Sequence, residues 1–420
     1  MTRISRRGAL KSLAGVAASG AFPFVSSPLR AQNNPIRIAV ICPLSGAKQP
    51  VGSPVLIGAE IARDQINAAG GVGGRMIELV TRDDKGDPVQ SIGAARELVG
   101  AGANLIVGVP LTSTALALAG IIESIDGVYI STGTQDETLT HERFTRHYFS
   151  ANENGITRQR GMARLLAEKY PDVRKWTAII PDISIGHGSW NRMSIGLTES
   201  YKQLYGKDVE IIDPILTKLG STDFKSQIVR LLSSPAEGLH NVLFGSDGIT
   251  FFQQANQLQL PQKFGVISEQ SIDIDLPKTL QGAIPKNIWS SSFWYHGAFP
   301  DNQVSKDLAE AYTKKTNDKN PHAFAALSHT GVHAYAKAIA AAGGKTDSKS
   351  VIDALENLPL DTAKGKSFFR KEDHQIITWG SAFNVTPTST NPQGWEIKNF
   401  AAIDLAKITN PPEPGQPFKI

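Results

Sequence analysis

Three consecutive hydroxyl residues are the group in this sequence best suited to bind a ligand. Thr112, Ser113 and Thr114 follow the apolar run 105–108, which is typical of a buried strand, and precede a helical pattern at 115–122. Hydroxyls beside the free N–H groups of a helix start can hold a carboxylate or phosphate, because donors and the positive end of the helix dipole converge there. The same residues could instead only cap the helix, so the rest of the chain has to decide between these roles.

Other groups of reactive residues fit a catalytic or metal site poorly. His329 and His333 are four residues apart on a predicted helix, but Thr330 stands where a zinc protease needs glutamate, so we expect structural histidines and no metal. Residues 186–190, Gly-His-Gly-Ser-Trp, lack the final glycine of a nucleophile elbow. The glycine-rich stretch 70–74 follows a helix rather than a strand, which argues against a nucleotide loop. The sequence predicts no catalytic residue and no cofactor.

Strands alternate with helices along most of the chain. Apolar runs at 36–42, 76–80, 105–108 and 127–131 predict four strands, and after a polar link at 150–155 the pattern restarts with runs at 176–180, 209–212, 241–245 and 264–267. Helices between such strands imply parallel sheets covered on both faces. Ligands of these folds gather at the carboxyl ends of the strands, where Thr112 to Thr114 and Thr132 to Gln135 lie.

The first 31 residues have the layout of an export signal. An Arg6-Arg7 pair precedes a mildly apolar segment, and Ala31 offers a small residue for cleavage, so we expect the protein to be exported from the cytoplasm. The motif leaves the twin-arginine and general secretory routes open. These residues hold five basic groups and no acid, so the net charge of +4 becomes −1 for the remainder, which does not favour nucleic acid. The single cysteine, Cys42, is expected to be a small core residue.

Five segments, in order and at familiar spacings, resemble the periplasmic substrate-binding proteins of branched-chain amino-acid type ABC importers. They are Ile38–Gly46, Gly58–Ala62, Ile66–Val72, Arg82–Pro88 and Arg370–Gln375. The resemblance spans nearly the whole chain after residue 31. It implies an α/β fold of two doubly wound, Rossmann-like lobes joined by three crossovers, the type I periplasmic binding fold. The expected division is residues 36–150 with 275–360 in the first lobe, 151–274 with 361–405 in the second, and an irregular tail at 406–420.

The resemblance also implies a binding site between the lobes. The residues it assigns to the ligand are Thr112, Ser113, Thr114, Gly133, Thr134, Gln135, Ile185, Asp247 and Glu269. The hydroxyl cluster and the loop after the fourth strand are expected to hold a ligand carboxylate and ammonium, with the Glu269 carboxylate against the ammonium. Two positions depart from the family, because Val51 and Ile185 stand where aromatic residues often occur. This departure points to a pocket shaped for a ligand other than an ordinary amino acid.

The resulting expectation is a non-enzymatic, monomeric carrier of a small amino acid, organic acid or amide, which closes by hinge motion and serves an inner-membrane ABC permease. Two alternatives stay open: a secreted hydrolase on the same scaffold with Ser113 or Ser189 as nucleophile, and a ligand sensor with the same fold. Ligand binding without turnover would separate the carrier from the hydrolase.

Overall fold

The computed structural model describes residues 34–270 and 272–419. The chain divides into Met1–Asn34 and a folded unit, Pro35–Ile420, whose architecture is given below. The expected export signal and its cleavage near Ala31 lie outside the described residues. No helix within the described ranges is both long enough and apolar enough to cross a membrane.

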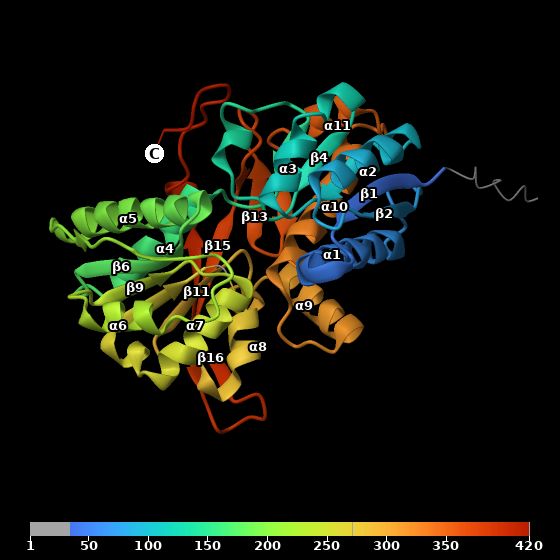
Figure 1. The fold of residues 1–420 in the computed structure, drawn as a ribbon. Helices are drawn as coiled ribbons and strands as arrows, with labels where there is room; N and C mark the ends of the chain where they lie inside the picture. Colours follow the sequence, from blue (N-terminus) through green and yellow to red (C-terminus); the bar gives the residue numbers. More distant parts are fainter. Residues whose placement is uncertain (1–33, 271, 420) are drawn as a thin grey trace, which may run out of the picture. The chain divides into compact units, whose positions relative to one another are not determined.

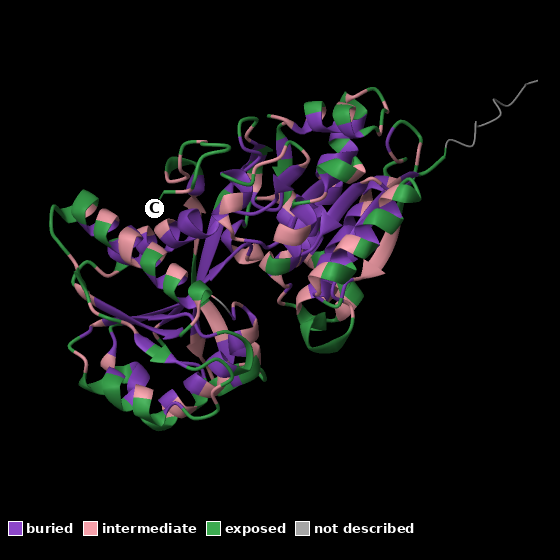
Figure 2. Ribbon diagram, turned by 45° about the horizontal axis from the view of Figure 1, so that its top comes forward, coloured by how far each residue is buried: buried purple, intermediate pink, exposed green. Residues whose placement is uncertain are grey.

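The first sheet is parallel and has helices on both faces. Its strands are β1 (Ile36–Cys42), β2 (Ile77–Asp83), β3 (Leu105–Gly108), β4 (Val128–Ser131) and β5 (Tyr148–Ser150), in the order β2-β1-β3-β4-β5. On one face Ile38 and Val40 pack against α1 (Gln49–Ala68), α10 (Ala323–Ala341) and α11 (Ser348–Leu355). On the other, Ala39 and Ile41 pack against α2 (Pro88–Gly100) and α3 (Thr112–Ala119). Side chains of a strand alternate between faces, so one apolar run supplies both cores. Figure 2 shows the buried strands between helices with exposed outer faces.

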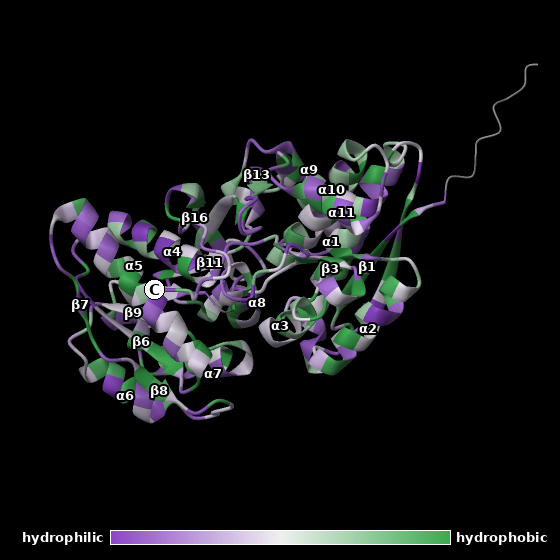
Figure 3. Cartoon of the chain, turned by 90° about the horizontal axis from the view of Figure 1, so that it is seen from above, coloured by the Kyte–Doolittle hydropathy of each residue, from purple (hydrophilic) through white to green (hydrophobic). Residues whose placement is uncertain are grey.

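The second sheet has eight strands and the same layered construction. They are β6 (Lys175–Pro181), β7 (Glu210–Ile211), β8 (Ile215–Thr217), β9 (Gly238–Asn241), β10 (Val266–Glu269), β11 (Ile288–Ser292), β15 (Trp379–Pro387) and β16 (Trp395–Asp404). The order is β16-β15-β11-β10-β9-β6-β7, with β8 also beside β6 and with β15 and β16 antiparallel to their neighbours. One face packs on α4 (Gly155–Lys169) and α5 (Ser184–Tyr205), and the other on α6 (Lys225–Ser233), α7 (Gly245–Gln257) and α8 (Asp275–Leu280). Apolar strands surrounded by helices of mixed polarity stand out in Figure 3.

The two lobes exchange chain segments at places that differ from the expected boundaries. The segment 275–360 was expected in the first lobe, but β11 pairs with β10 and so belongs to the second sheet. The segment 361–405 was expected in the second lobe, but its first part forms a small sheet of β12 (Leu360–Thr362), β13 (Gly365–Phe369) and β14 (Ile376–Ile377), which packs in the core of β1. In Figure 1, α9 (Gln303–Thr316), α10, α11 and β13 lie with the blue elements, and β15 and β16 with the green and yellow ones.

The chain therefore crosses between lobes three times, after β5, after β11 and between β14 and β15. An apolar run identifies a strand but not the sheet that it joins, because pairing partners are set by tertiary contacts. The number of crossovers agrees with the expectation, and their positions along the chain do not.

The segment after β16 is irregular, as the sequence predicts, and it returns to the first lobe. After a short 3-10 helix, Leu405–Lys407, residues 408–419 form neither helix nor strand. The N–H of Gly415 donates to the carbonyl of His141 at 2.7 Å, and the ring of Phe418 meets the ring of His141 edge-on at 4.8 Å. The tail thus leads from the end of the second sheet back to the first lobe, where it contacts His141.

Candidate ligand-binding cleft

A cleft of about 570 Å³ lies between the lobes and is lined from both. From the first lobe it takes Ala47, Pro50, Val51, Leu111, Thr112, Gly133 and Gln135, and from the second it takes Arg158, Gln159, Ile185, Ser189, Arg192, Phe244, Gln270 and Asp273, among others. These residues follow the carboxyl ends of β1, β3, β4, β5, β6, β9 and β10. The loops at these strand ends position the lining residues, as expected for open parallel sheets. The volume is in the range typical of small-molecule sites, roughly 300–1,000 Å³.

The hydroxyl cluster at the start of α3 splits into three different environments. Thr112 lines the cleft, and its hydroxyl accepts from the Thr134 hydroxyl at 3.4 Å. Ser113 is exposed and outside the lining. Thr114 is buried, and its hydroxyl donates to the carbonyl of Leu111 at 2.7 Å. Of the three residues expected to bind, Thr112 alone presents its side chain to the cleft, while Thr114 stabilises the first turn of the helix.

The loop after β4 is held in shape by one buried amide, Asn152. Its Oδ1 accepts from the N–H of Gly133 at 2.7 Å, and its Nδ2 donates to the carbonyl of Thr134 at 2.6 Å. Gly133 has φ +121°, and a Cβ there would lie 2.9 Å from the Phe324 ring, so only glycine fits. Gly133 and Gln135 line the cleft, while Thr134 is buried behind them and reaches it through its contact with Thr112.

Aromatic rings absent at the two family positions occur elsewhere in the cleft. Val51 and Ile185 both line it, and Ile185 is 54% exposed at the start of α5. Phe244, Phe293 and Phe324 supply rings, and Phe244 is 37% exposed. Trp190 and Trp294 are buried and outside the lining. Sequence reasoning missed these phenylalanines, although Phe293 directly follows a strand and Phe244 lies at the start of α7, where ligand contacts are expected.

Two acids expected at the site lie outside the cleft lining. Asp247 is buried, and its carboxylate accepts from the N–H of Gly220 at 2.7 Å. Glu269 is fully buried at the end of β10, and its carboxylate accepts from the N–H groups of Ile272 at 2.5 Å and Asp273 at 3.1 Å. Glu269 therefore fixes the loop that presents a different carboxylate, Asp273, to the cleft.

Asp273 is an incompletely bonded acid in the cleft wall. Its Oδ2 accepts from the Ser292 hydroxyl at 2.7 Å, whereas its Oδ1 is shielded from solvent and has no hydrogen-bond partner among the described residues. Burial raises the pKa of the Asp273 carboxyl above its usual value, which nearby His322 and Arg158 partly counteract. An acceptor of this kind is suited to a ligand N–H group. Nothing in the sequence pattern distinguished Asp273 from an ordinary loop acid.

Two arginines of the second lobe reach the cleft with different partners. Arg192 on α5 pairs with Glu137 at 2.5 Å, and Glu137 belongs to the 3-10 helix Glu137–Thr140 of the first lobe. Arg158, near the start of α4, is 5% exposed and donates to Ser291 and to the carbonyl of Gln270. Neither arginine was predicted from the sequence, because arginine side chains on helices are usually solvated.

The residues weighed for catalysis and metal binding have other partners. The Ser189 hydroxyl contacts the side-chain amides of Gln159 and Gln270, and no imidazole bonds to it within the described residues. Nε2 of His329 and Nε2 of His333 both contact the side-chain amide oxygen Oε1 of Gln65, at 2.7 and 3.3 Å. No group of three or more metal-ligating side chains occurs in the part of the chain that the structure describes.

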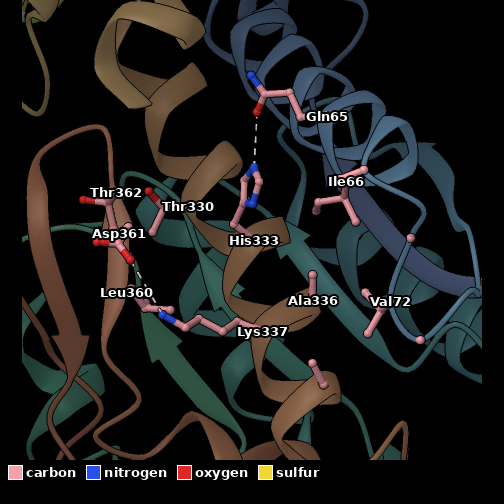
Figure 4. Close-up of a pocket in the computed structure, with 14 residues that line it drawn as sticks. Gln65, Ile66, Val72, Thr330, His333, Ala336, Lys337, Leu360, Asp361 and Thr362 are labelled. Carbon is pink, nitrogen blue, oxygen red and sulfur yellow. Dashed lines mark hydrogen bonds and ion pairs between the residues drawn. The ribbon is translucent and has the colours of Figure 1, made fainter. Parts of the chain in front are cut away.

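A second hollow of about 480 Å³ lies within the first lobe, where α1, α10 and β12 meet (Figure 4). His333 points toward Gln65 at its upper side, and the Lys337 ammonium approaches the Asp361 carboxylate at 3.8 Å across it. This hollow is lined from one lobe only. The interlobe cleft is the better candidate because both lobes and seven strand ends converge on it.

The fold and the cleft are those of a two-lobed α/β ligand-binding protein. Its described residues hold neither a serine bonded to a histidine in the cleft nor a metal-ligating group. A family model for periplasmic binding proteins matches residues 35–389. The chain belongs to that family, whose members are the solute-binding components of ABC transporters and are not enzymes.

Individual relatives agree with this assignment. The chain is 26% identical over 372 residues to the Leu/Ile/Val-binding protein homolog 3 of Brucella melitensis, covering 85% of this chain and 92% of the relative. Its fold is similar to the closed leucine-, isoleucine-, valine-, threonine- and alanine-binding protein of Brucella ovis, with TM-score 0.79, 19% identity, and 90% and 97% coverage. A solute-binding protein of Rhodopseudomonas palustris in complex with 3,4-dihydroxybenzoic acid has TM-score 0.73, 18% identity, and 89% and 98% coverage. The type I periplasmic binding fold predicted from the sequence is confirmed.

Proposed function

We propose that this protein is exported to the periplasm, binds a small amino-acid-like or organic-acid ligand in the interlobe cleft, and delivers it to an inner-membrane ABC permease. The observation that carries the proposal is the cleft itself, which polar and apolar side chains from both lobes line. The names of similar proteins support both ligand classes, since one relative is named for Leu, Ile and Val and one structural neighbour holds an aromatic acid.

In this proposal the first lobe holds a ligand carboxylate through the Thr112 hydroxyl, at the start of α3, and its partner Thr134 in the loop after β4. The positive end of that helix favours an anion. Asp273, with its unpartnered Oδ1, faces a ligand N–H group, and Glu269 acts by holding the loop of Asp273 in place. Ser113 and Asp247 lie outside this contact set.

Closure of the lobes would bury apolar side chains that line the cleft. Ile185 and Phe244 of the second lobe are substantially exposed and line the cleft opposite Pro50, Val51 and Leu111 of the first. Bringing these side chains together over a ligand removes apolar surface from water, which favours the closed form at roughly 25 cal/mol per Å². The three crossovers are the points at which the chain can bend.

The experiment is a thermal-shift screen of amino acids, aromatic acids and small amides, followed by calorimetry with the compounds that bind. A carrier gains about 2.7 kcal/mol of apparent stability at a ligand concentration of 100 Kd, without product formation. Accumulation of a product would contradict the carrier function.

The first-lobe subsite is tested by the double variant Thr112→Ala, Thr134→Ala, which should bind roughly tenfold more weakly or worse, because it removes the hydroxyl pair at the helix start. The matched control is Ser113→Ala, which lies between them in the sequence but outside the lining and should bind as the wild type does. Equal affinities for all three proteins would remove this stretch from the site.

A further inference from the structure

Arg158 is a buried cation that lines the cleft. Its side chain extends from the first turn of α4, and the residue is 5% exposed. Nε donates to the Ser291 hydroxyl at 3.0 Å, and Nη2 donates to the carbonyls of Ser291 at 2.6 Å and Gln270 at 3.1 Å. The Phe293 ring lies 4.3 Å from the guanidinium carbon. Within the part of the chain that the structure describes, the groups that contact this guanidinium are therefore uncharged.

No carboxylate lies within 4 Å of this guanidinium among the described residues. The acids that act on it from further away each have another partner. Glu153 pairs with Lys364 at 2.8 Å, Glu269 accepts backbone N–H groups, and Asp273 accepts from Ser292. Burial lowers the pKa of Arg158 even though Glu153, Asp273 and Glu269 oppose the change. A buried charge without a close counter-ion is costly, so proteins usually pair it.

One side of the guanidinium has hydrogen-bonding capacity left. Nη1 donates to no atom in the ranges 34–270 and 272–419, while Nε and Nη2 hold the group in place. Gln159, Ser189 and Gln270 lie at the same end of the cleft, and the Oε1 of Gln159 is buried without a partner. A fixed guanidinium with a free edge is suited to a carboxylate, because its N–H groups match the carboxylate oxygens.

We propose that the ligand carries an acid group at the end that meets the second lobe, and that Arg158 is its counter-ion. This inference rests on the proposed function, in which the hydroxyls of the first lobe hold a separate carboxylate. The ligand class is then a small organic acid with an acid group at each end, a dicarboxylate or an acidic amino acid. Arg158 thereby determines specificity against acids with a single carboxylate.

The test compares acids with their amides, using wild-type protein and calorimetry. The two-acid probes are succinate and L-glutamate, the amide partners are succinamate and L-glutamine, and the one-acid probes are L-leucine and benzoate. We expect a two-acid probe to bind roughly tenfold or more tightly than its amide partner, because the amide lacks the charge that pairs with Arg158. This comparison requires no variant and so does not depend on folding of a mutant.

Arg158→Met should abolish the preference for acid over amide, and Arg158→Lys should retain part of it because it keeps the charge. The matched control is Arg164→Met, on the same helix, whose side chain pairs with Glu168 outside the cleft and should leave the preference unchanged. Melting temperatures without ligand report whether each variant is folded.

Tight binding of L-leucine or benzoate with no preference for the two-acid probes would overturn the inference while leaving the proposed function standing. An acid preference that persists in folded Arg158→Met would also overturn it. If none of the six probes binds wild-type protein while the thermal-shift screen finds another ligand, the inference fails and the proposed function stands; if the screen finds no ligand either, both fail.

Discussion

The buried ion pair between Lys364 and Glu153 allows a test of how the crossovers between the lobes are stabilised. Glu153 lies in the first crossover, and Lys364 lies in the turn between β12 and β13. Their charged atoms are 2.8 Å apart, and their side chains are only 4% and 2% exposed. The pair therefore connects a crossover to the small sheet that leads into the third crossover.

Removing either partner alone should destabilise the protein by about 3–5 kcal/mol, because the remaining charge stays buried without a counter-ion. Removing both with Lys364→Met and Glu153→Gln should restore most of that loss, since uncharged side chains of similar volume carry no such cost. The matched control is Lys366→Met in the same hairpin. Lys366 is 84% exposed and pairs with Asp361 at the surface, so its loss should cost about 1 kcal/mol or less.

Urea unfolding of the four variants, followed by circular dichroism, measures these free energies through the shift in midpoint. The reasoning is refuted if Lys364→Met costs no more than Lys366→Met, or if the double variant is less stable than both single ones. Either result would mean that solvent or rearrangement screens the remaining charge, and that the low exposure of the pair does not describe its energetics.

Two further predictions concern buried positions away from the cleft. His240 is fully buried, neither of its ring nitrogens has a hydrogen-bond partner among the described residues, and burial lowers its pKa to about 3. The His240 imidazole takes up a proton near pH 6.5 in the unfolded chain but only near pH 3 in the folded protein, so the free energy of unfolding should fall between pH 6.5 and about 3. His240→Phe should remove roughly 3–5 kcal/mol of that loss. In urea titrations, an acid dependence of the variant identical to that of the wild type would contradict this. Gly58→Ala should destabilise by about 1–3 kcal/mol or more, because its Cβ would lie 2.0 Å from the carbonyl oxygen of Ala325 where α1 crosses α10. Gly93→Ala, in open space on α2, should instead stabilise by about 0.5–1 kcal/mol in thermal unfolding, and equal effects of the two changes would disprove the packing argument.

The fold could be predicted from the sequence largely because its signals are local. Each apolar run such as 105–108 buries both faces of a strand, and each glycine or capping residue at a helix end acts within a few residues. The positions of the crossovers could not be predicted in the same way. Whether β11 joins one sheet or the other depends on its pairing with β10 and β15, which are distant in sequence from one another.

The candidate site was partly predictable for the same reason. Strand ends identified Thr112, Gly133 and Gln135 as residues near the cleft, the family resemblance added Ile185, and all four line it. Which of three adjacent hydroxyls faces a ligand depends on the helical turn, which directs Thr114 inward and Ser113 to solvent. The sequence around Arg158 does not indicate a role in binding. Its unusual property, that no carboxylate of the described residues lies within 4 Å of its guanidinium, appears only in three dimensions.

Hydrogen bonds of a single residue, Asn152, join the Gly133–Thr134 loop to two of the crossovers between the lobes. Asn152, in the first crossover, fixes the Gly133–Thr134 loop through its side chain, while its own carbonyl accepts from Nε2 of Gln375 at 2.7 Å, next to the third crossover. Because these groups are buried, separating them would leave unpaired amides, which costs free energy. We therefore expect the loop that we propose binds the ligand to move together with the ends of the first and third crossovers that lie in the first lobe. In the closure that we propose, rotation of the second lobe relative to the first brings Arg158 and Asp273 toward a ligand held at Thr112.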